Sequence, residues 1–69
     1  MKSAVSLRDL LKYIDMGLDD AAIRTLVGPS LWEYDLKLAR NAIKQPDGLY
    51  LVEGNLGKIL LAPSDTLPH

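Results

Sequence analysis

The stretch that decides the fold is Leu49-Tyr-Leu-Val-Glu-Gly-Asn-Leu-Gly-Lys-Ile-Leu-Leu-Ala62, close to the end of this 69-residue sequence. Two apolar runs flank a connection rich in the residues of tight turns, so the stretch predicts a β-hairpin over residues 49–62. Successive side chains of a strand point to opposite faces, and a hairpin with one solvent-exposed face alternates apolar and polar residues. Here both faces are apolar, because residues 49–52 are all Leu, Tyr or Val. One face is expected to pack on preceding elements, and the other to need a partner.

The connection of this hairpin leaves its register open. Two glycines and an asparagine within residues 54–57 can supply the positive φ of a tight return. A loop centred on Gly54 and Asn55 pairs the strands differently from a four-residue loop over residues 54–57. The sequence therefore decides neither the pairing nor which face of the hairpin meets the rest of the chain.

Three helices are expected before the hairpin, over residues of about 6–16, 19–27 and 30–45. The first begins at Ser6, whose hydroxyl can cap the first turn, and ends near Gly17. The second has Asp19 as its N-cap and is stopped by Gly28-Pro29. For the third, the sequence Ser30-Leu-Trp-Glu33 predicts a capping box.

Apolar residues recur at helical spacing within each of these three segments. The expected buried faces are Leu7, Leu10, Leu11 and Ile14 in the first helix; Ala22, Ile23, Leu26 and Val27 in the second; and Trp32, Leu36, Ala39 and Ile43 in the third. We therefore predict an α+β fold in which three short helices precede a C-terminal β-hairpin. Residues 1–69 form a single small domain, with residues 63–69 as a mobile tail.

Composition excludes several classes of protein. The sequence has no cysteine, and its only histidine is His69, so disulfides, thiolate metal sites and histidine clusters are excluded and no metal or cofactor is expected. No run approaches the ~20 apolar residues of a membrane span. Arg8 and Asp9 interrupt the apolar core that a signal peptide would need, so we expect a cytoplasmic protein. A domain this small buries about 60% of its surface on folding, and self-association would add stability.

No set of residues predicts catalysis. Asp15, Asp19 and Asp20 are close in sequence, but helix capping explains them and no calcium-loop spacing is present. Gly57-Lys58 follows another glycine as in a phosphate loop, yet that loop needs Ser or Thr next, where Ile59 stands. We therefore expect no enzyme and no small-molecule substrate.

The apolar hairpin favours a non-enzymatic regulatory module, of the inhibitor or adaptor type, that binds stoichiometrically to a protein partner or to a second copy of itself. Trp32 has two interpretations: a core residue beneath the Gly28-Pro29 corner, or an exposed interface anchor beside Leu31. The candidate interface residues are Leu31, Trp32, Tyr50, Val52, Leu60 and Ala62.

A second hypothesis comes from the order of elements over residues 6–62, which resembles the winged helix-turn-helix architecture. Within it, Ala21-Ala-Ile-Arg-Thr-Leu-Val-Gly28 is similar to the first helix and turn glycine of that motif, and Ser30 opens the next helix. The resemblance implies a DNA-binding transcriptional regulator whose third helix enters the major groove of duplex DNA and whose hairpin is the wing. The residues implied for DNA contact are Lys37, Arg40, Asn41, Lys44 and Lys58. As an alternative, the basic residues of the third helix form an ordinary solvated face, and the net charge of −1 does not itself predict a polyanion binder.

Overall fold

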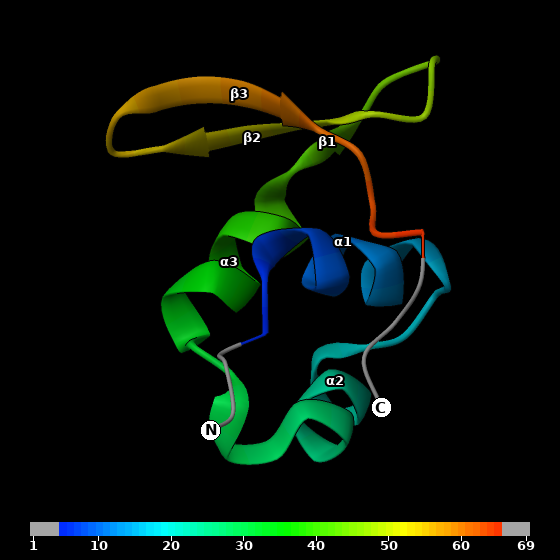
Figure 1. The fold of residues 1–69 in the computed structure, drawn as a ribbon, viewed down its shortest axis with the longest axis vertical. Helices are drawn as coiled ribbons and strands as arrows, with labels where there is room; N and C mark the ends of the chain where they lie inside the picture. The colour runs from blue at the N-terminus through cyan, green and yellow to red at the C-terminus, as the bar shows by residue number, and fades with distance from the viewer. Residues whose placement is uncertain (1–4, 66–69) are drawn as a thin grey trace.

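The computed structural model describes residues 5–65, which form two layers (Figure 1). A three-stranded antiparallel sheet, in the order β1-β2-β3, lies over a layer of helices. The elements are α1 (Leu7–Asp15), α2 (Asp20–Val27), the 3-10 turn η1 (Gly28–Ser30), α3 (Glu33–Asn41), β1 (Ile43–Lys44), β2 (Tyr50–Gly54) and β3 (Gly57–Leu61). The predicted α+β class, with three helices before the hairpin, is confirmed.

The first helix starts and ends through local interactions. Ser6 is the N-cap of α1, and its hydroxyl accepts a hydrogen bond from the Asp9 backbone N–H at 3.2 Å. Gly17 follows the helix with φ 89°, a left-handed conformation that glycine adopts without strain. Its N–H donates to the Ile14 carbonyl at 2.9 Å, which satisfies one of the free carbonyls at the helix end.

The second helix also begins as predicted, with the Asp19 carboxylate accepting from the Ala22 N–H at 2.8 Å. Ile23 is fully buried, but Leu26, which we predicted to be on the buried face, is 61% exposed. The helix is only eight residues long and buries a narrow stripe centred on Ile23, so Leu26 falls outside it.

The third helix begins later than predicted. Ser30 does not cap it, because Pro29 and Ser30 are taken into η1 and the Leu31 N–H donates to the Gly28 carbonyl. Leu31 and Trp32 are then extended, and Trp32 is an N-cap position without a side-chain hydrogen bond. The tight turn that Gly28 and Pro29 form therefore replaces the capping box.

The same helix ends four residues earlier than predicted. Ala42 is extended, and Ile43 and Lys44 form β1, in register with Leu51 and Tyr50 of β2. Residues 43–45 have helical periodicity in the sequence, but pairing with β2 satisfies their backbone groups as a strand instead.

The hairpin has a two-residue loop, Asn55-Leu56, closed by the pair Gly54 and Gly57. Glu53 lies opposite Lys58, which is the strand pairing predicted for a four-residue loop over residues 54–57; in the structure Gly54 and Gly57 pair as well. Only Gly57 of the connection has positive φ, at 121°; Asn55 does not. The predicted need for positive φ is therefore met at one position.

The core joins the sheet to α1 and α3 and reaches α2 through Ile23. It is made of Leu10, Leu11, Tyr13, Ile23, Leu36, Ala39, Tyr50 and Val52. Beyond β3 the chain stays against α1, because Arg8 Nε donates to the Ala62 carbonyl at 2.8 Å and the Ser64 hydroxyl donates to Asp9 at 2.6 Å. Of the predicted mobile tail, residues 66–69 lie outside the described residues.

Candidate functional site

Two of the predicted interface residues belong to the core. Tyr50 is 5% exposed and Val52 is 2% exposed, so both side chains are buried. The register places both on the sheet face that covers the helices, and Tyr50 also donates a 2.9 Å hydrogen bond to Asp15 of α1. Burial raises the pKa of the Tyr50 hydroxyl, chiefly by desolvation. Both residues were predicted as exposed interface residues, and the structure instead buries them, because the sequence alone does not decide which face of the hairpin meets the helices.

The opposite face of the sheet carries an apolar row across all three strands. Ile43 pairs with Leu51, and Leu51 pairs with Leu60, so the three side chains point the same way. Ile43 is 61% and Leu60 is 54% exposed, because the helices lie on the other side of the sheet (Figure 1). The predicted interface residue Leu60 is thus accessible.

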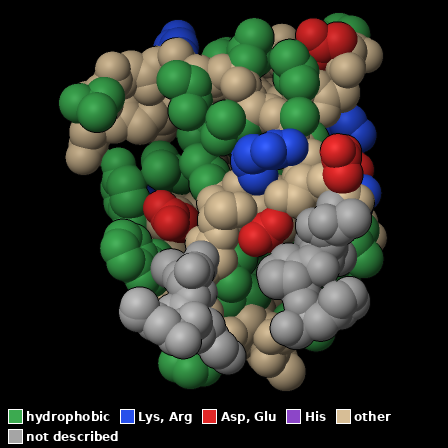
Figure 2. Space-filling view, viewed as in Figure 1, with side chains coloured by type: hydrophobic (Ala, Val, Ile, Leu, Met, Phe, Trp, Pro, Cys, Tyr) green, Lys and Arg blue, Asp and Glu red, His purple; other side chains and the backbone are tan. Residues whose placement is uncertain are grey.

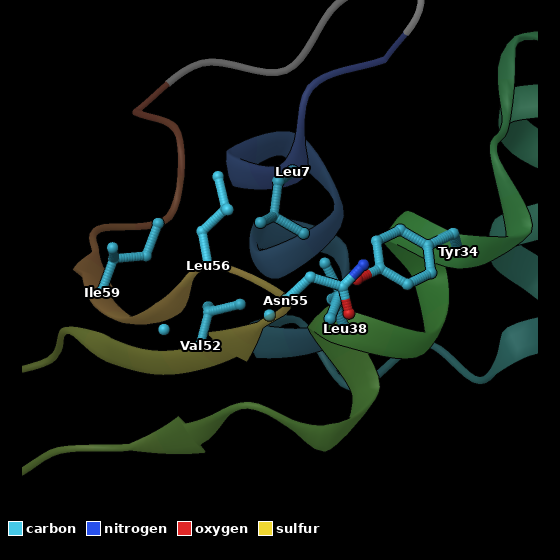
Figure 3. Close-up of a pocket in the computed structure, with 9 residues that line it drawn as sticks. Leu7, Tyr34, Leu38, Val52, Asn55, Leu56 and Ile59 are labelled. Atoms are coloured by element: carbon cyan, nitrogen blue, oxygen red, sulfur yellow. The ribbon is translucent and has the colours of Figure 1, made fainter.

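A second apolar surface, the hairpin groove, lies between the end of the hairpin and the helices α1 and α3 (Figure 3). It is an open hollow of about 400 Å³. Its lining residues come from α1, α3 and the hairpin: Leu7, Tyr34, Leu38, Val52, Gly54, Asn55, Leu56, Gly57 and Ile59. Figure 2 shows apolar side chains gathered below the hairpin tip, at the left of the view.

The residues that make the hairpin groove unusual are at its rim. Leu56 occupies the tip of the hairpin and is fully exposed, while Ile59 and Tyr34 are about half exposed. Turn tips normally carry polar residues, glycine or proline. The apolar Leu56 between Asn55 and Gly57 is the feature of the sequence that indicates this surface, and it was not among the predicted interface residues.

The remaining predicted interface residues are spread over the molecule. Trp32 is 64% exposed, so the core interpretation of this residue is wrong and it stands at the surface before α3. Leu31 and Ala62 are half-buried, and Leu31 packs against the core. The structure therefore does not bring Trp32, Leu60 and Ala62 into the same lining of the hairpin groove.

Two of the predicted DNA-contacting residues are held in ion pairs. Arg40 binds Asp20 at 2.7 Å and also donates to the Leu18 carbonyl at 3.0 Å. Lys44 lies on β1 rather than on α3, and its ammonium donates to Asp15 at 2.8 Å. This hydrogen bond is the main reason that the pKa of Asp15 is lowered.

The other three candidates for DNA contact are exposed. Lys37 and Asn41 lie on α3, beside a shallow polar hollow between α2 and α3. That hollow is bridged by Arg24 and Glu33, whose side chains form two hydrogen bonds of 3.1 and 2.7 Å. The bond lowers the pKa of Glu33 and raises that of Arg24. Lys58 stands opposite Glu53 on the outer face of the hairpin, away from these residues.

Within residues 5–65, no three His, Cys, Asp or Glu side chains gather as a metal site would require. No helix in this part of the chain has the length and apolar character to cross a membrane.

Comparisons with known proteins add no functional assignment. No protein-family model matches the chain, and neither the curated proteins nor the solved structures contain a significant match. The order of three helices and an antiparallel sheet is compatible with a winged-helix-like topology, and this likeness rests on the arrangement of elements alone.

Proposed function

We propose that this chain is a non-enzymatic protein-binding module that acts as an inhibitor or adaptor by seating apolar side chains of a protein partner in the hairpin groove. The observation that carries the proposal is the open groove itself, with Leu56 fully exposed at its rim. Contiguous exposed apolar surface of this kind marks interaction sites in small proteins.

The groove offers a partner both area and an anchor. Burying a fully exposed leucine contributes about 1.5–3 kcal/mol, so Leu56 alone would supply a substantial share of a micromolar affinity. Tyr34 lies on the α3 side with its ring half exposed, and tyrosine is enriched among the residues that dominate binding energy. A partner segment with two or three neighbouring apolar side chains, such as one face of an amphipathic helix, suits this lining.

The test is a selection of displayed peptides on the wild-type protein, followed by NMR mapping of the peptides recovered. The proposal expects peptides with apolar anchors that shift the resonances of Leu7, Leu38 and Leu56 and lose binding to Leu56→Glu. Leu26→Glu is the matched control, because Leu26 is also an exposed leucine but lies on α2, outside the groove. Peptides that bind Leu56→Glu as well as the wild type would overturn the proposal.

A DNA-binding function is the second candidate, and it is supported by the winged-helix-like order of elements and by the exposure of Lys37 and Asn41 on α3. The ion pairs of Arg40 and Lys44 weigh against it, since DNA contact by either residue would compete with its carboxylate partner. Fluorescence anisotropy with a labelled duplex at about 50 and 200 mM salt separates the candidates. Binding that falls steeply with salt and weakens in Lys37→Ala would favour DNA, and absence of binding at the lower salt would exclude it.

A further inference from the structure

We infer that two copies of this chain pair antiparallel along β3, about a two-fold axis that passes through Ile59. The surface involved is the open edge of the sheet, so the inference goes beyond the proposed use of the hairpin groove. β3 ends the strand order β1-β2-β3, and within the described residues no further strand covers it.

The backbone groups that face the open edge follow from the hairpin register. Gly54 and Gly57 close the two-residue turn, so they form a hydrogen-bonded pair, and such pairs alternate along antiparallel strands. Ile59 and Leu61 therefore direct their backbone groups to β2, whereas Lys58 and Leu60 direct theirs outward. The hydrogen bonding between β1 and β2 is consistent with this pattern. Leu49 accepts from the Gln45 N–H at 2.7 Å, as expected if the odd-numbered residues of this strand direct their backbone groups to β1.

Only three two-fold registers join the outward groups of β3 to each other. The first places Lys58 opposite Lys58 of the second copy, which sets two like charges directly across from one another. The second places Leu60 opposite itself and needs Ala62 opposite Lys58, but the Ala62 carbonyl already accepts from Arg8. The third places Lys58 opposite Leu60 of the second copy and the two Ile59 residues opposite each other. It avoids both the pair of like charges and the use of Ala62.

The third register also suits the side chains. It uses every outward N–H and C=O of Lys58 and Leu60, giving hydrogen-bonded pairs on both sides of Ile59. The two Ile59 side chains meet at a non-hydrogen-bonded position, where side chains across antiparallel strands come closest. On the outer face, Leu60 lies against the aliphatic stem of Lys58 from the second copy, and Lys58 is itself paired with Glu53 in the register of the hairpin.

The edge lacks two of the devices that block pairing of edge strands. It contains no proline and its register is continuous without a bulge, and Lys58 is its single charged residue. Its length is about 17 Å at ~3.4 Å per residue. A stable interface takes about 800 Å² from each partner. That area is about a sixth of the 4855 Å² of solvent-accessible surface of the whole chain. An edge of five residues buries less area than this when it pairs. The association should therefore be reversible and dependent on concentration.

Single cysteines test the register, because the chain has none of its own. A disulfide forms only where the two Cα atoms are within about 7 Å. Ile59→Cys should cross-link as the protein concentration rises through the micromolar range under mild oxidation, whereas Lys58→Cys and Leu60→Cys should not. Cross-linking of either of the latter in preference to Ile59→Cys would overturn the inference.

Proline variants test the edge itself by sedimentation equilibrium. Leu60→Pro removes an N–H that faces the open edge, so the hairpin should persist, as judged by circular dichroism, while self-association is lost. Ile43→Lys is the control: it changes an exposed residue of the same sheet face on the opposite strand and should dimerise like the wild type. A wild-type protein that stays monomeric into the millimolar range, or a Leu60→Pro protein that still dimerises, would overturn the inference. Leu56 lies outside the paired residues. Leu56→Glu should therefore abolish the proposed groove binding and leave dimerisation intact, so each proposal can be contradicted without affecting the other.

Discussion

The Tyr50 hydroxyl on β2 donates a 2.9 Å hydrogen bond to Asp15 at the end of α1 and thereby joins the sheet to the helical layer. The same carboxylate oxygen accepts from the Lys44 ammonium at 2.8 Å, so three elements meet at one acceptor. This bond also shows why the buried face of the hairpin is the one with Tyr50: its phenol ring fills the core while its hydroxyl reaches a polar partner at the edge of the core.

The first prediction concerns acid sensitivity. The pKa of Asp15 is lowered in the folded state, chiefly by the hydrogen bond from Lys44. Its contribution to stability is therefore present above the unfolded-state pKa, near 3.8, and is lost as the pH falls through the lower folded-state value. Asp15→Asn should reduce stability at neutral pH and flatten its decline below about pH 5, measured as urea midpoints across pH. Asp65→Asn, an exposed carboxylate without an ion pair among the described residues, should keep the wild-type profile; an unchanged profile in Asp15→Asn would contradict the assignment.

The second prediction separates the two faces of the hairpin. Val52→Lys should unfold the protein, because an unpaired buried charge costs several kcal/mol and a chain of this length has about 3–10 kcal/mol of stability. Leu60→Lys should remain folded, since Leu60 is 54% exposed on the other face. Circular dichroism with thermal unfolding distinguishes them. If both variants unfold, the outer row of the sheet is covered by part of the chain.

The third prediction concerns the hairpin turn. Gly57 has φ 121°, and a Cβ there would meet no atom within 4 Å, so the cost of Gly57→Ala is conformational rather than steric. We expect a loss of more than about 1 kcal/mol in the free energy of unfolding. Gly54→Ala is the matched control, with equal space but no positive φ, and should change stability less. Equal effects of the two substitutions in urea titrations would show that the turn has a different conformation.

The fourth prediction uses the single tryptophan of the chain. Trp32 is 64% exposed, so acrylamide should quench its fluorescence in the native protein nearly as well as in urea. Trp32→Ala should change the free energy of unfolding by less than about 0.5 kcal/mol, as is usual for a surface substitution. Strong protection of the native fluorescence would place Trp32 in the core after all.

Short-range chemistry was predictable from the sequence. Ser6, Gly17 and Asp19 act where their residue types predict, because a helix cap depends on atoms within a few residues of it. The strand pairing of residues 53 and 58 was among the registers that the turn allowed. The predicted helix cap at Ser30 was wrong, because the neighbouring Gly28-Pro29 turn takes this residue into η1.

The features that bear on function were decided by the tertiary structure. Both faces of the hairpin are apolar, so only packing against α1 and α3 could bury Tyr50 and Val52 and leave Leu60 outside. Arg40 and Lys44 are cations in any conformation, but their partners Asp20 and Asp15 lie 20 and 29 residues away in the chain. The hairpin groove joins residues from α1, α3 and the hairpin tip. The sequence by itself determined the three helices, the hairpin and their order, because these follow from local periodicity and capping. Strand β1, the exposed apolar surface and the pairing of charges depend on contacts that exist only once the layers are packed together.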